Sequence, residues 1–319
     1  IPYVYALFAI AIITAVYLVM GGYVAVNLTN LFQGIIMILG VGFLLYYVVE
    51  SPQVGGWGEI IPRLSAIDPK LVAPVGPGGP VALFSLVLLT SLGTWGLPQM
   101  TQKFYAIKNE AVIKKATIVT FIFCLWIAFG AYFTGSLSHL FFTDLSAVGN
   151  NVDKIIPTMI NMTLPGWVAL LILLLVLSAS MSTLASLVLV ASSAVVMDLV
   201  QMAKPKIEQK KVVLLMRLCC VVFVAISLYL ALIPNNIINL MSFSWGTIAG
   251  AFLAPYVLGL FMKGITKTAA WIGMISGVVL SIGLTVLLNG NTPLAGTIAM
   301  IAPLLIIPIV SKFTKPYSK

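Results

Sequence analysis

Five hydroxyl side chains lie close together in LSASMSTLAS, residues 177–186, within a stretch that is otherwise apolar. They are Ser178, Ser180, Ser182, Thr183 and Ser186. As one helix, residues 166–198 are about 50 Å long at 1.5 Å per residue, so the midpoint falls near Ser182. Lipid offers no hydrogen bonds at that depth, and each hydroxyl must therefore find a partner inside the protein.

Two interpretations of these hydroxyls remain open. In the first, small side chains let helices pack closely, and each hydroxyl bonds to a carbonyl one turn earlier. In the second, they hold Na⁺, a hard cation that takes neutral oxygen ligands. The adjacent Ser182 and Thr183 point roughly 100° apart on a helix, which suits two ligands. The Ala179 carbonyl would be a third ligand, and another helix would supply the rest.

A second interruption of an apolar segment is TSLGTWGLPQ, residues 90–99. Gly93, Gly96 and Pro98 weaken the hydrogen-bond ladder of a helix. The sequence predicts either a packing kink or a discontinuous helix that presents backbone groups to a bound solute. The candidate solute-binding residues on this segment are Ser91, Thr94 and Trp95.

A third mixed segment is SFSWGTIAGAFLAP, residues 242–255. Gly246 and Gly250 have the spacing of close helix packing. Ser244 and Trp245 are further candidates to face a cavity and bind the solute.

These segments must sit in membrane helices, because the chain is 61% hydrophobic and only 8% charged. Apolar stretches of roughly 18 residues recur, and each can cross a hydrocarbon core of ~30 Å. We expect residues 1–319 to form a single polytopic, all-α transmembrane domain with about nine spanning helices. The predicted helices are Tyr3–Met20, Tyr23–Val49, Ala82–Tyr105, Val112–His139, Gly166–Leu199, Val212–Ile233, Ile237–Met262, Thr268–Leu288 and Pro293–Val310.

The 17 Lys and Arg residues divide unevenly between alternate loops. With the N-terminus of the chain outside, only Arg63, Lys70 and Lys154 lie on the outer side. Because cytoplasmic loops accumulate Lys and Arg, this distribution predicts an outside N-terminus and a cytoplasmic C-terminus. The outer loops are then residues 50–81 and 140–166. The same rule accounts for the net charge of +9 without a nucleic-acid partner.

Several function classes are disfavoured. The sequence has no phosphate-binding glycine loop, zinc motif or nucleophile elbow, so we do not expect an enzyme. No acidic residue and no histidine falls at mid-membrane, which disfavours a proton relay. The three cysteines lack metal-type spacing and are expected to be small core residues.

Four stretches together resemble the sodium:solute symporter family. They are YLVMGGYVAVNLTNLFQG (17–34), GTWGLPQMTQKFYAIKN (93–109), ASMSTLASLVLVASSAVVMDL (179–199) and SWGTIAGAFLAPYVLGLFMKGITKTAAWIGMISG (244–277). The resemblance implies a LeuT-type fold of two inverted five-helix repeats. It also implies a partial fold, with core helices four to ten, two extra C-terminal helices, and three N-terminal core helices missing.

The resemblance also assigns roles by position. Ser182, Thr183 and the Ala179 carbonyl match the family's sodium ligands. Thr94 and Trp95 stand where the family has an aromatic pair near the solute and inner gate, with Thr in place of the usual Tyr. Asn30 stands where the family usually has an Asp that assists sodium on the inner side, which puts it on the ion release path.

The expected function is sodium-coupled symport of a small organic solute, of the amino acid, sugar or carboxylate type, across the cell membrane. Its partners would be Na⁺, the solute and the lipid bilayer. The alternative is a non-transporting membrane solute sensor or scaffold that retains the transporter fold, and Asn30 and Thr94 keep this alternative open.

Overall fold

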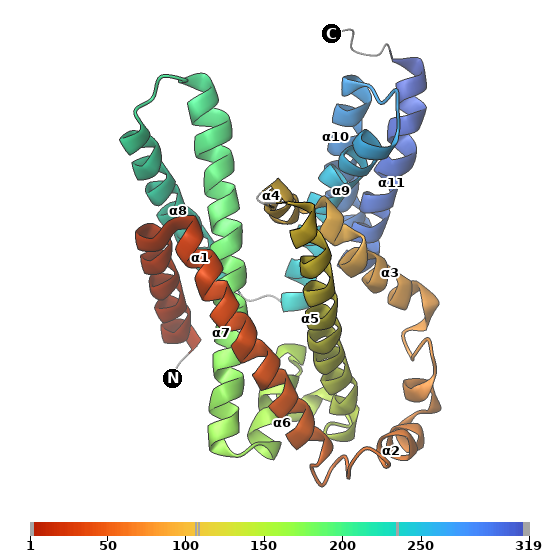
Figure 1. Ribbon diagram of the computed structural model, residues 1–319. Coiled ribbons are helices and arrows are strands. Elements are labelled where there is room, and N and C mark those ends of the chain that lie inside the picture. Colours follow the sequence, from red (N-terminus) through yellow and green to blue (C-terminus); the bar gives the residue numbers. More distant parts are fainter. Residues whose placement is uncertain (1–2, 106, 108, 234–235, 315–319) are drawn as a thin grey trace. The chain divides into compact units, whose positions relative to one another are not determined.

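The computed structural model describes residues 3–105, 107, 109–233 and 236–314, and these are almost entirely helical. Contacts divide the chain into two compact units. Unit 1 comprises residues 1–67 and 108–234, and unit 2 comprises residues 68–107 and 235–319. Each unit therefore combines segments that are far apart in the sequence (Figure 1).

The helices of unit 1 are α1 (Tyr3–Val49), α2 (Ile60–Ile67), α5 (Glu110–Leu137), α6 (Ile155–Thr163), α7 (Gly166–Ser193), the π-helical η6 (Ala194–Gln201) and α8 (Gln209–Ala231). Short 3₁₀ turns η3 (Ser138–Leu140), η4 (Leu145–Val148) and η5 (Val152–Lys154) lie between α5 and α6. The helices of unit 2 are η1 (Pro69–Val72), α3 (Gly79–Ser91), η2 (Gly93–Gly96), α4 (Pro98–Tyr105), α9 (Ile237–Phe261), α10 (Lys267–Leu287) and α11 (Thr292–Phe313).

Eight helical stretches of the described chain are long and apolar enough to cross a membrane, and a shorter apolar helix covers Val4–Met20. Each of the nine overlaps one of the nine predicted segments. Polar caps help to set where the helices begin. Asn109, Thr266 and Asn291 each accept a hydrogen bond from the backbone N–H three residues later. Such caps satisfy donors that the first turn of a helix leaves free.

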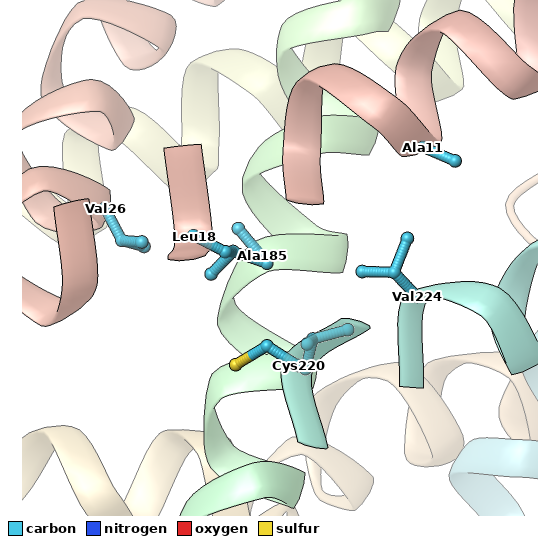
Figure 2. Packing of buried hydrophobic residues seen from close by; sticks show 7 residues of the cluster. Ala11, Leu18, Val26, Ala185, Cys220 and Val224 are labelled. Atoms are coloured by element: carbon cyan, nitrogen blue, oxygen red, sulfur yellow. The ribbon is translucent and has the colours of Figure 1, made fainter. Parts of the chain in front are cut away.

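The first two predicted segments differ from the structure. Helical backbone continues through Gly21 and Gly22, where the sequence predicted a break, so both segments belong to α1. Glycine residues are common sites of bending in a continuous helix. Figure 1 shows α1 changing direction, with its first turns beside its later ones. Both parts of α1 contribute to one buried cluster with α7 and α8 (Figure 2).

The interruption predicted at residues 93–98 is confirmed. Helix α3 ends at Ser91, a 3₁₀ turn follows, and α4 begins at Pro98. Leu97 is extended, as expected for a residue before proline. A Cβ on Gly96 would lie 2.8 Å from the backbone N of Leu253, so glycine is needed for the close approach of α9.

The loop predicted at residues 50–81 is only partly irregular, because it contains α2 and η1. Arg63 of α2 donates to the carbonyls of Pro52 and Gln53, at 2.9 Å each, and forms an ion pair with Glu59 at 3.5 Å. These bonds fold the loop back on itself. The short helix α6 lies inside the second predicted outer loop, residues 140–166.

The cysteines are less uniform than predicted. Cys220 is buried, but Cys219 is half-buried and Cys124 is exposed. The apolar run around Cys124 belongs to α5, whose first half is exposed throughout, so apolarity there reflects a lipid-compatible surface instead of a protein core.

Glycines hold the long helices of unit 2 together. Gly246 of α9 lies against the backbone of Gly296 in α11. Gly250, one turn later, lies against the carbonyls of Gly277 in α10 and Ala299 in α11. The predicted packing role of Gly246 and Gly250 is therefore confirmed, and the missing side chains let the three backbones meet.

We predict that Gly277→Val destabilises the protein by about 1–3 kcal/mol, because a Cβ at this position would overlap the Gly250 carbonyl. Thermal unfolding in detergent would measure the change. The matched control is Gly283→Ala in the same helix, where a Cβ meets no atom within 4 Å. Equal unfolding temperatures for Gly277→Val and the control would contradict this account of the packing.

Candidate ion and solute sites

The five hydroxyls of α7 do not share one environment. Ser178 is buried, Ser182 and Ser186 are half-buried, and Ser180 and Thr183 are exposed. Helical geometry puts Ser178, Ser182 and Ser186 on neighbouring parts of one face and Ser180 on the opposite side. The inward hydroxyls can therefore act together, and Ser180 cannot join them.

Two of the three predicted sodium ligands touch each other. The Thr183 hydroxyl donates to the Ala179 carbonyl at 2.9 Å. This is the backbone bond that the packing interpretation predicts for Thr183. Both oxygens can still coordinate a cation, because a donating hydroxyl keeps its lone pairs and a carbonyl oxygen has two lone pairs. Ser182 has no side-chain hydrogen bond to any residue that the structure describes.

Contacts along α1 and α7 show that the two helices are antiparallel. In order from the end of α1, Phe43 contacts Trp167, the Gly40 backbone meets the Leu175 side chain, and Val26 shares a buried cluster with Ala185 and Val188. Gln33 lies seven residues before Gly40, and Ser182 lies seven residues after Leu175. Both are therefore about 10.5 Å from the same contact, on the faces that meet. The register brings Gln33 to the level of Ser182.

Asn30 and Gln33 bring unpaired oxygen atoms to this level. Gln33 is only 7% exposed, yet its Oε1 has no hydrogen-bond partner in the described chain. The Oδ1 of Asn30, one turn earlier, is likewise buried and unpaired. A buried amide oxygen without a partner costs about 1–3 kcal/mol, so such groups call for an explanation.

The sequence pointed to Asn30 but missed Gln33. Their three-residue spacing on a helix was the available signal, because residues i and i+3 share a face. What the sequence could not supply was the register that turns this face toward α7.

Tyr17 supports α7 from the other part of α1. Its hydroxyl donates to the Met181 carbonyl at 2.9 Å, across 164 residues of chain. The Met181 carbonyl belongs to the peptide that leads into Ser182. This bond fixes the backbone at the centre of the hydroxyl cluster.

Unit 2 contains a cavity of ≈ 360 Å³ at the broken helix. It is lined by Trp95, Gly96, Pro98, Thr101, Phe252, Pro255 and Tyr256. Trp95 is 55% exposed and presents a large part of its ring. Of the predicted solute-binding residues, Trp95 lines this cavity, and the sequence missed Phe252 and Tyr256.

The other predicted solute-binding residues lie elsewhere in unit 2. The Thr94 hydroxyl donates to the Ser91 carbonyl at 2.8 Å, which helps to close the 3₁₀ turn. Ser91 and Ser244 are exposed, and Trp245 is half-buried. All four are absent from the cavity lining. Ser244 and Trp245 precede Phe252 by about two helical turns on α9.

No group of three His, Cys, Asp or Glu side chains lies close enough to hold a metal ion among the residues that the structure describes. A cation held by α1 and α7 would therefore rely on hydroxyl, carbonyl and amide oxygens. Such neutral oxygens suit a monovalent cation, since they add no fixed charge at mid-membrane.

Comparison with known proteins decides the family. The model of the sodium:solute symporter family matches residues 1–277. The chain belongs to the sodium:solute symporter family. This confirms the resemblance found in the sequence and places the chain in a family of membrane transporters, not of enzymes.

One relative of this symporter-family chain is a sodium/pantothenate symporter of Haemophilus influenzae, which is 31% identical to it over 295 residues. The aligned region is 91% of this chain and 59% of the relative. A sodium/proline symporter of Staphylococcus aureus is 27% identical over 282 residues, 86% of this chain and 54% of the relative. The chain thus spans a little over half the length of these relatives.

A solved structure also matches this symporter-family chain. It is the substrate-bound, outward-open state of a Na⁺-coupled sialic acid symporter, with a TM-score of 0.73 and 18% sequence identity. The match covers 100% of this chain and 69% of that chain. It confirms the expected LeuT-type fold.

We predict that Gln33→Leu stabilises the protein in sodium-free buffer by about 1 kcal/mol, because it removes a buried amide without a partner at little change of volume. Thermal unfolding in potassium buffer would measure this. Gln209→Leu is the control, since the same exchange at an exposed position should change stability by less than about 0.5 kcal/mol. A lower stability for Gln33→Leu would show that its amide is satisfied.

Proposed function

We propose that the protein containing this chain carries out sodium-coupled symport of a small organic solute across the cell membrane. The observation that carries the proposal is that α1 holds two buried amide oxygens without partners, on Asn30 and Gln33. The register of α1 against α7 puts Gln33 near the level of Ser182. Family membership and the sodium-coupled relatives support it.

In this proposal, Na⁺ binds to the Ala179 carbonyl and the hydroxyls of Ser182 and Thr183. Gln33 and Asn30 approach the same level and supply oxygens as the ion enters or leaves. Asn30 is neutral, so it holds a cation less strongly than a carboxylate would, which favours release toward the inner side. The ion exchanges its water shell for these oxygens, and Tyr17 keeps the Met181–Ser182 peptide in place.

Coupling follows if Na⁺ prefers one conformation. By joining α1 to α7, the ion favours the outward-open state, and solute that binds the same state then binds more tightly. The effect is reciprocal, so the solute also raises the affinity for Na⁺. Alternating access then releases both inside.

We propose a carboxylate as the solute class. Pantothenate, proline and sialic acid, the solutes named for the three relatives, all carry a carboxylate group. In this chain the solute would contact the broken helix, with its apolar part against Trp95, Phe252 and Tyr256. Ser91, Thr94, Ser244 and Trp245 are the further candidates for solute contact.

The lysine distribution supports an outside N-terminus and a cytoplasmic C-terminus for this chain. Lys114, Lys204, Lys206 and Lys312 would then lie on the inner side. Lys108, Lys315 and Lys319, which the same argument uses, lie outside the described residues.

A second candidate function is solute sensing without transport. It is favoured by Thr94, whose hydroxyl is bonded within its own turn and offers no aromatic gate. Reconstituted vesicles distinguish the two functions, since a sensor binds solute without any sodium-driven flux.

The test of symport is a double substitution, Ser182→Ala/Thr183→Ala, in the full-length protein. We expect the sodium concentration for half-maximal uptake to rise about tenfold or more, because two ligands of a charged group are lost. Uptake of radiolabelled solute, measured at a series of external sodium concentrations, would give this value. Ser180→Ala removes a hydroxyl from the opposite, exposed side of the helix and should leave the sodium dependence unchanged.

Unchanged sodium dependence in the double variant would refute the ion site, even if transport itself is found. Loss of uptake with unchanged sodium binding, measured by sodium-induced thermal stabilisation, would contradict the assignment as well.

A further inference from the structure

Basic residues concentrate between the end of η6 and the third turn of α8. They are Lys204, Lys206, Lys210, Lys211 and Arg217, and all are exposed. Lys211 forms an ion pair with Glu208 at 3.8 Å. The other four have no acidic partner among the residues that the structure describes. This polybasic turn, defined as residues 204–217, therefore carries unneutralised positive charge.

The polybasic turn is concave. A hollow of ≈ 680 Å³ is lined by Lys204, Pro205, Lys206, Ile207, Glu208 and Lys211. A second hollow of ≈ 450 Å³ follows on the first turns of α8 and is lined by Gln209, Lys210, Val213, Leu214 and Arg217. The two hollows share no lining residue, but they follow each other along the chain, from residues 204–211 to residues 209–217.

The second hollow mixes charge with apolar surface in a definite order. Arg217 lies seven residues after Lys210, which is about 10.5 Å along the helix and almost on the same face. Between them, Val213 is 44% exposed and Leu214 is 56% exposed. Arg217 can reach toward the interface with its long side chain, so two cations border an apolar strip. From Lys204 to Leu214 the order is basic residues followed by exposed apolar ones, which is complementary to a phospholipid with an anionic headgroup and a hydrocarbon chain.

We propose that the polybasic turn binds one anionic phospholipid. Its headgroup would occupy the hollow between Lys204 and Lys206, its phosphate would bridge Lys210 and Arg217, and an acyl chain would lie along Val213 and Leu214. Clustered Lys and Arg beside a membrane helix attract anionic lipid electrostatically. The hollows distinguish this turn from Lys114 and Lys115 on α5, which are equally exposed.

The test compares lipid retention in variants that lose the same charge. Full-length protein is purified with equal amounts of phosphatidylglycerol and phosphatidylcholine, and bound lipid is counted by native mass spectrometry. For Lys206→Gln/Arg217→Gln, we expect retained phosphatidylglycerol to fall about tenfold relative to the unmodified protein. For the control Lys114→Gln/Lys115→Gln, we expect a fall of less than about twofold. The substituted side chains are exposed, so folding should not suffer.

Two further experiments test whether the bound ligand is the whole phospholipid or only a phosphate group. Arg217→Lys keeps the charge and should keep the lipid, and addition of inorganic phosphate should not displace phosphatidylglycerol. Equal losses in the two double variants would overturn the proposal in favour of diffuse surface attraction. Displacement by inorganic phosphate would overturn it in favour of a site for the phosphate group alone. None of these results depends on sodium binding.

Discussion

The structure depends on one constraint, which is that the bilayer interior cannot pair a polar group. Every hydroxyl and amide at mid-helix must therefore face protein or bear the cost of an unpaired buried oxygen. Most of this chain meets the constraint locally, as when the Thr183 hydroxyl bonds to the Ala179 carbonyl. Asn30 and Gln33 are among the residues that do not, because their side-chain oxygens are buried without partners. In the proposed sodium site, these two oxygens of α1 would find their partner in the ion.

Each unit solves the problem of close packing in its own way. In unit 2, Gly246 and Gly250 bring three helix backbones into contact, which leaves little room for movement between them. In unit 1, glycines admit side chains instead of backbone: Gly40 of α1 accommodates the Leu175 side chain, and Gly130 of α5 accommodates the Val41 side chain. In the proposed transport mechanism, unit 2 would contact the solute and unit 1 would bind the ion.

The sequence predicted the membrane helices well because apolar length and glycine or proline punctuation are local properties. It also predicted the broken helix, since Gly93, Gly96 and Pro98 act on their own turn. It did not single out Gln33, Phe252 and Tyr256, because burial and cavity lining depend on which helix faces a residue, and no local pattern encodes that. It predicted a break at Gly21 and Gly22, where the helical backbone continues but changes direction, because a glycine pair permits a bend as readily as a stop (Figure 1).

The π-helical η6 gives α7 a property that a straight helix would lack. A π-helical turn holds about one residue more than an α-helical turn and frequently occurs at functional sites. The hydroxyls of α7 precede η6, and the cationic turn follows it. Because π-helical hydrogen bonds skip one more residue than α-helical bonds, η6 rotates the chain by a different angle from a continued α-helix. The direction of residues 204–217 relative to the hydroxyls of α7 is therefore set by η6.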